Sequence, residues 1–129
     1  MKDLDFDIDL EHTLLRFTNG IQYIIRKDGT FTGEMAKEIA ETRLKKLNET
    51  SCPTLISTNG NFIDDSAKKY LQSDEFKEIH SASAVAMIAN NRAKIMVLTV
   101  ITSYMNLPCP IKIFKKIEDG EKWLKQFID

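Results

Sequence analysis

The side chains best suited to chemistry are two consecutive aspartates followed by a serine, Asp64, Asp65 and Ser66. A helical pattern follows them, and Asp and Ser are residues that helix N-caps prefer. The same groups could instead form a docking or phosphorylation surface, because the dipole at a helix start favours negative charge. The sequence leaves both interpretations open.

The loop before these residues follows a predicted strand and contains Ser57 and Asn59. In open α/β sheets, ligands bind outside the carboxyl ends of the strands. The loop lacks the spaced glycines of a phosphate-binding loop, so an ordinary turn is the competing interpretation. We group Ser57 and Asn59 with the Asp-Asp-Ser segment as one candidate docking loop.

Histidines and cysteines are too sparse to predict a metal site or a catalytic centre. His12 and His80 have no recognisable partner at metal-ligand spacing. Cys52 and Cys109 each precede a proline and an apolar run. This predicts reduced, buried thiols at the starts of two strands, with a single disulfide as the alternative. We therefore expect no enzyme activity, no cofactor and no metal.

One long segment, residues 95–107, carries no charged side chain. On a helical wheel its apolar side chains cover about 200°, at ~100° per residue. The segment could be a well-buried helix, a homodimer face, or one wall of a pocket for an apolar ligand. The side chains that would form this interface or pocket wall are Met96, Val97, Val100, Ile101 and Tyr104.

Hydrophobic periodicity predicts the strands that position these candidates. Residues 4–10 alternate between acidic and apolar types, and Asn19-Gly20 between two apolar runs signals a hairpin. The further strands are expected at 53–57, 82–88 and 111–114.

Capping residues predict where the helices lie. The expected helices are 32–48 with a Thr32 cap, one capped by Asp64 or Asp65, a second piece capped by Ser73, a segment from an Asn90 cap to Asn106, and 118–128. Strands that alternate with helices predict parallel pairing, while the first strands, joined by short turns, are antiparallel additions at one edge.

The composition fits a single domain over residues 1–129. The formal net charge of -1 argues against a nucleic-acid binder. The longest apolar run falls far short of the ~20 residues that span a bilayer. The acidic start is not a signal peptide. We expect a cytoplasmic protein without membrane insertion.

The C-terminal half carries a family resemblance. The apolar run 84–88 precedes a polar turn and a long apolar helix, and Pro110 to Phe114 precede an acidic helix start and Trp123-Leu124. This pattern resembles the STAS domain of sulfate-transporter tails and anti-sigma-factor antagonists. It is most similar to small bacterial proteins described as STAS-like or SpoIIAA-like. The order of elements extends the resemblance over nearly the whole chain.

The resemblance implies an α/β fold with a mainly parallel sheet of about four to five strands in sequential order. It also implies an antiparallel N-terminal edge and helices mostly on one face. In anti-sigma-factor antagonists, a kinase phosphorylates a serine directly after an aspartate at a helix start. Here Asp64 matches that aspartate, Asp65 occupies the place of the serine, and Ser66 follows one position later. A carboxylate there could imitate a permanent phosphate charge, or could be an ordinary cap.

The expected function is a non-catalytic protein-protein interaction or regulatory module, with an unidentified protein partner and a homodimer as one form. The alternative is a binding protein for a small apolar or lipid-like ligand, held between the uncharged helix and the sheet.

Overall fold

The computed structural model describes residues 5–27, 29–47, 51–57, 63–79, 82–105 and 109–128. Its elements are, in chain order, β1 (Phe6–Asp9), β2 (Thr13–Thr18), β3 (Ile21–Arg26), α1 (Gly33–Leu47), β4 (Cys52–Ser57), α2 (Asp65–Gln72), α3 (Asp74–Ile79), β5 (Ala82–Ile88), α4 (Arg92–Met105), β6 (Ile111–Phe114) and α5 (Ile117–Leu124), which ends in a 3-10 turn (Lys125–Phe127).

The strands form one six-stranded sheet whose spatial order is the order of the sequence. β1 and β3 both pair with β2 in antiparallel fashion, whereas β3 to β6 pair in parallel. The expected α/β class, sequential order and antiparallel N-terminal edge are confirmed. The sheet has six strands, which agrees with the strands predicted from hydrophobic periodicity and exceeds the four to five that the resemblance implies.

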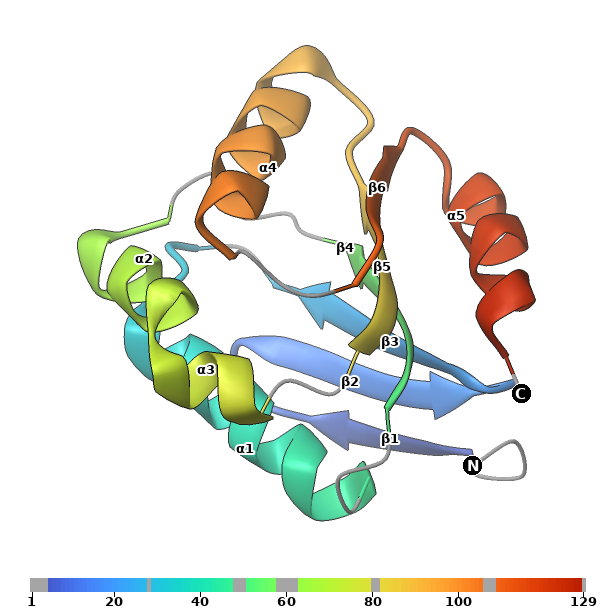
Figure 1. The fold of residues 1–129 in the computed structure, drawn as a ribbon, viewed down its shortest axis with the longest axis horizontal. Helices are drawn as coiled ribbons and strands as arrows, with labels where there is room; N and C mark the ends of the chain where they lie inside the picture. Colours follow the sequence, from blue (N-terminus) through green and yellow to red (C-terminus); the bar gives the residue numbers. More distant parts are fainter. Residues whose placement is uncertain are drawn as a thin grey trace.

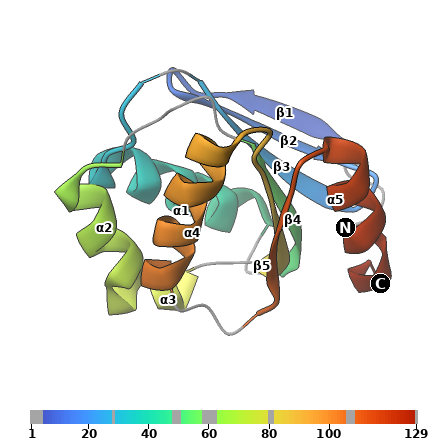
Figure 2. The ribbon, with the colours of Figure 1, turned by 90° about the horizontal axis from the view of Figure 1, so that it is seen from above.

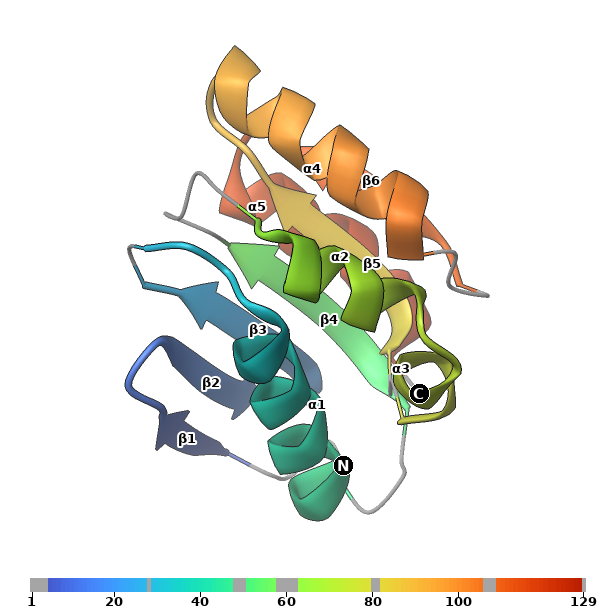
Figure 3. The same cartoon turned by 90° about the vertical axis from the view of Figure 1, so that its left-hand side faces the viewer.

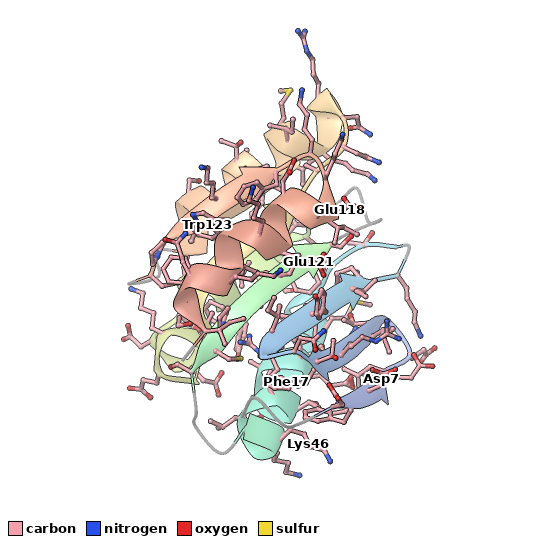
Figure 4. The ribbon with its side chains drawn as sticks, turned by 90° about the vertical axis from the view of Figure 1, so that its right-hand side faces the viewer. Asp7, Phe17, Lys46, Glu118, Glu121 and Trp123 are labelled. Atoms are coloured by element: carbon pink, nitrogen blue, oxygen red, sulfur yellow. The ribbon has the colours of Figure 1, made fainter. Side chains whose placement is uncertain are left out.

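The helices cover the two faces of the sheet unequally. α1, α2, α3 and α4 lie on one face and α5 lies on the other (Figure 1, Figure 2). Figure 3 looks onto the face covered by α1 to α4. From the opposite side, α5 lies over β4 and β5, and no helix covers β1 and β2 (Figure 4). The expectation that helices lie mostly on one face is confirmed.

The central strand β5 explains where the core sits. Val85 and Met87 belong to a cluster with Leu98 of α4, whereas Ala84 and Ala86 pack in a cluster with Leu124 of α5. Successive side chains of a strand point to opposite faces, so a strand covered on both faces must be apolar throughout. This is why the continuous apolar run in the sequence predicted a buried strand.

The N-terminal hairpin turns at the predicted Asn-Gly pair. Asn19 has a φ of 55° and Gly20 a φ of 79°, the left-handed conformations that these two residue types adopt most readily in tight hairpins. On the uncovered side of the sheet, Arg16 of β2 binds Asp7 of β1 through two hydrogen bonds of 3.0 and 3.1 Å. The acidic face of the first strand is therefore partly neutralised by its neighbour.

Side-chain caps fix the starts of α1 to α4. The Thr32 and Ser73 hydroxyls accept from N–H groups in the first turns of α1 and α3, as expected. For α4 the cap is Asn91, whose Oδ1 accepts from the Lys94 N–H at 2.9 Å, and not Asn90 as expected from the sequence. Two adjacent asparagines offered the same chemistry, and the end of β5 decided between them.

Among the described residues, no helix is long and apolar enough to cross a membrane.

Candidate functional site

The candidate docking loop leads into the N-terminus of α2, where Asp64 is the N-cap. Its Oδ1 accepts hydrogen bonds from the Ser66 hydroxyl at 2.6 Å and from the Ala67 N–H at 2.8 Å. The bond from Ser66 and then the bond from Ala67 stabilise the ionised carboxylate, and they hold the pKa of Asp64 below its ordinary value. Of the two aspartates that could cap this helix, Asp64 is the one that does so.

Ser66 joins the starts of α1 and α2. Its Oγ accepts a hydrogen bond of 2.8 Å from the N–H of Gly33, the first residue of α1. A Cβ at Gly33 would lie 2.7 Å from the carbonyl oxygen of Ser66, so glycine is what allows the two helices to approach. A phosphoryl group on this Oγ would replace the bond to Asp64 with repulsion between two anions.

Asp65 differs from its two neighbours because it points into solvent. Its side chain is 94% exposed and lies 4.0 Å from the Lys68 ammonium. Asn59 lies outside the described residues. Ser57, the last residue of β4, is half-buried and lines a separate hollow. The structure thus brings Asp64 and Ser66 into contact, and leaves the docking role of the whole group a prediction.

The uncharged helix α4 is anchored on one side and open on the other. Leu98 is 2% exposed, whereas Met96 is 69% exposed and Val100 46%. Val97 is half-buried between these two sides, and the side chains of Ile101 and Tyr104 lie outside the described set. Of the interpretations left open by the sequence, a well-buried helix fits the side of Leu98, and it does not account for the exposure of Met96 and Val100.

The polar side chains of α4 bind their own helix. The hydroxyls of Thr99, Thr102 and Ser103 donate to the carbonyl oxygens three or four residues earlier, at 2.7, 2.9 and 2.6 Å. Such backbone bonding occupies the hydroxyl protons. The exposed side of α4 is therefore less polar than its Ser and Thr content suggests.

A hollow of about 280 Å³ lies where β4, β5 and β6 end. Ser57 and Ile88 are the last residues of β4 and β5, and the lysine pair that follows β6 completes one side. The residues that line the hollow are Ser57, Ile88, Asn90, Lys94, Lys115, Lys116, Ile117 and Glu118. Figure 4 labels Glu118 in the first turn of α5.

The three lysines of this hollow, Lys94, Lys115 and Lys116, are not among the site residues expected from the sequence. By itself, a two-residue basic run such as Lys115-Lys116 is too short to indicate a nucleic-acid patch, and is typical of solvated charges at a helix end. A usable signal was present: Lys94 follows the end of β5 by a few residues, and the pair follows β6 directly. Carboxyl ends of neighbouring parallel strands meet at one edge of a sheet, so the three lysines could be expected near the same edge.

A second groove, of about 530 Å³, lies beside α5 over the hairpin turn and β3. Within it the Tyr23 hydroxyl donates a hydrogen bond to the Glu121 carboxylate. Burial first, and then this bond, raise the pKa of Tyr23 above its ordinary value. Glu118, Glu121, Lys122 and Lys125 also line the groove, so its charges balance.

In the part of the chain that is described, no three His, Cys, Asp or Glu side chains are arranged to hold a metal ion.

A solved structure shares this fold. It is an uncharacterised protein of the DUF3478 family with a SpoIIAA-like fold from Shewanella loihica PV-4. The match has a TM-score of 0.59 at 14% identity, and covers 94% of this chain and 92% of that chain. The SpoIIAA-like fold expected from the sequence is confirmed.

A comparison with the curated proteins finds no match. The family model that matches covers residues 15–128 and is described as a domain of unknown function, DUF7793. The match begins at Leu15 within β2, and takes in β3 to β6 and the helices α1 to α5. The chain belongs to the DUF7793 family.

Proposed function

We propose that this chain is a non-catalytic cytoplasmic module that binds a protein partner through the exposed side of α4. The observation that supports this most directly is the adjacent pair Met96 and Val100, 69% and 46% exposed. Residues four apart lie on the same side of a helix. The two side chains therefore form one apolar surface rather than two scattered exposures.

The surroundings of this pair also favour a contact surface. From Ile95 to Met105 the helix carries no charged side chain. Surface helices ordinarily place charges opposite their buried stripe. Burial of apolar area contributes roughly 25 cal/mol per Å², and partner contacts use such uncharged apolar surfaces. A STAS-like module that acts by docking accounts for this helix, because it needs a surface and no reactive group.

The proposal is tested with one charge added at the proposed surface and one added elsewhere. Met96→Lys and Val100→Lys place a cation on the exposed side of α4. The matched control is Gln126→Lys, an exposed position in the turn after α5 on the other side of the sheet. Each protein is chemically cross-linked in cell extract and the partners are identified by mass spectrometry. Light scattering over a range of protein concentrations reports self-association.

We expect one reproducible protein partner with wild type and Gln126→Lys, lost in both α4 variants while their melting temperatures stay unchanged. A second copy of this chain would appear as a dimer by light scattering, lost in the same two variants. Retention of the same partners by Met96→Lys and Val100→Lys would contradict the proposal.

A further inference from the structure

The hollow where β4, β5 and β6 end has a strong excess of positive charge. Lys94, Lys115 and Lys116 line it against a single carboxylate, Glu118. None of the three lysines forms a salt bridge with a carboxylate of the described residues. Three lysines that line one hollow repel one another through their like charges, and an anion bound in the hollow would offset that repulsion.

The hollow also offers neutral groups of two kinds. The Ser57 hydroxyl and the Asn90 amide are hydrogen-bonding side chains at the ends of β4 and β5. Ile88 and Ile117 add apolar surface, and Ile117 is 43% exposed. Ligand sites combine an apolar lining with a few polar groups that fix orientation. A lining of this composition suits a molecule with an anionic end and a less polar body.

The start of α5, which lies beside this hollow, also carries an unusual amount of positive charge. Its N-cap is Lys116, which makes no side-chain capping bond, whereas α1 to α4 are each capped by a side-chain oxygen. A cation at the positive end of a helix is unfavourable. Glu118 and Asp119 in the first turn offset part of this cost. The lysines add positive charge where the helix already supplies it.

We propose that this hollow binds a small phosphorylated molecule, with its phosphate among Lys94, Lys115 and Lys116. Hydrogen bonds between charged groups are the strong ones, and lysine binds phosphate as a point charge. The volume of about 280 Å³ lies just below the usual range of ligand pockets, which suits a sugar phosphate rather than a dinucleotide. Ser57 and Asn90 contact the hydroxyl groups of the ligand body. Among the described residues of α4, Lys94 is the one that lines this hollow, and Met96 and Val100 do not line it, so the outcome here does not decide the proposed function.

The test uses the full chain, labelled with 15N, in a buffer without phosphate or sulfate. Amide shifts are followed during titration with ribose 5-phosphate, and separately with ribose, inorganic phosphate and sulfate. The variants are Lys94→Gln and the double variant Lys115→Gln/Lys116→Gln. The matched control is Lys69→Gln, an exposed lysine of α2.

We expect saturable shifts with ribose 5-phosphate, confined to residues around 57, 88–94 and 115–118. The Kd should rise about tenfold or more in each hollow variant, because a charged hydrogen bond is lost, and stay unchanged in Lys69→Gln. Inorganic phosphate should bind more weakly at the same residues, and ribose should not bind.

Three results would overturn the proposal. The first is no saturable shift, and the second is shifts spread evenly over all surface lysines. The third is sulfate binding as tightly as ribose 5-phosphate, which would leave only unspecific attraction of anions. If Lys94→Gln does not fold, the exposed double variant gives the same decision.

Discussion

The hydroxyls of two tyrosines, Tyr23 and Tyr70, differ in their hydrogen bonding. The Tyr23 hydroxyl donates to the Glu121 carboxylate and so links β3 to α5. The Tyr70 hydroxyl of α2 is buried and has no hydrogen-bond partner among the described residues. A hydrogen bond to a charged group stabilises a protein by about 1.5–3 kcal/mol, whereas a buried hydroxyl without a partner costs free energy.

Tyr23→Phe should therefore lower the free energy of unfolding at pH 7 by about 1–2 kcal/mol, since Glu121 stays partly solvated. Tyr70→Phe makes the same chemical change where no bond is lost, and should leave stability unchanged or raise it. Urea unfolding of the two variants and wild type measures the difference. Equal losses in both variants would show that the Tyr23 bond contributes nothing special.

The same two side chains make stability depend on pH above neutrality. Burial is the largest cause that raises the pKa of Tyr23, and it raises that of Tyr70 to about 12. The unfolded chain loses these protons near pH 10, so above that pH the folded state holds more protons. The stabilisation is complete below pH 10 and is lost as pH rises through the folded-state pKa values. Each Phe variant should therefore show a shallower loss of the free energy of unfolding between pH 10 and 12 than wild type.

Ser66 gives a prediction at the start of α2. Ser66→Ala removes the bonds to Gly33 and Asp64, and should cost about 1–2 kcal/mol in urea unfolding. The control Asp65→Ala changes a side chain that is 94% exposed, and should stay within about 0.5 kcal/mol. Equal effects would mean that the junction between α1 and α2 does not depend on this hydroxyl. The pair also tells docking from capping, because Asp65 can affect a partner without affecting stability.

Among the elements, α4 shows the sharpest division between a packed side and an open side. Leu98→Ala should cost about 2–4 kcal/mol, because it leaves a cavity between α4 and the sheet. Met96→Ala should change stability by less than about 0.5 kcal/mol, because its side chain is already in water. Thermal unfolding at two protein concentrations measures both. A large, concentration-dependent loss in Met96→Ala would show that self-association already covers this side.

The elements themselves could be predicted from the sequence because their signals are local. Alternation gave β1, Asn19-Gly20 gave the hairpin, and Thr32 and Ser73 gave two helix starts. The expected starts of α4 and α5 were each off by a small amount. Before α4, two adjacent asparagines offer the same capping chemistry, and tertiary packing chooses between them. The N-cap of α5 is Lys116, which makes no side-chain capping bond, so no capping residue marks that start in the sequence.

The candidate sites could be predicted only in part, because they depend on contacts between residues that are far apart in the chain. Asp64 as a cap is a local property, and it was predictable. The bond between Ser66 and Gly33 joins residues 33 apart in the chain, and no pattern within one segment shows it. The wide apolar arc of α4 likewise did not indicate which side is buried, because a helical wheel does not show what packs against the helix.

At the scale of the whole molecule, the sheet is protected unevenly. β5 has helices on both faces and a strand on each side, whereas β1 is an edge strand with the exposed side chains of Asp7 and Asp9 on its uncovered face. Local opening is easiest where few apolar contacts must be broken. Opening β1 breaks its pairing with β2 and its contacts with a few apolar side chains. Opening β5 exposes the core on both faces at once.

Native-state hydrogen exchange should therefore show different protection for the central strand β5 and the edge strand β1. The β5 amides of Val85, Ala86 and Met87 should exchange only through global unfolding, with the urea dependence of the whole molecule. The β1 amides that bond to β2 should exchange through a smaller opening with little urea dependence. Leu98→Ala should lower the protection of β5 and leave that of β1 unchanged, because α4 packs far from the N-terminal edge. If β1 and β5 instead share one exchange free energy, the antiparallel edge and the parallel part unfold together, and β1 is part of the cooperative core rather than an addition to it.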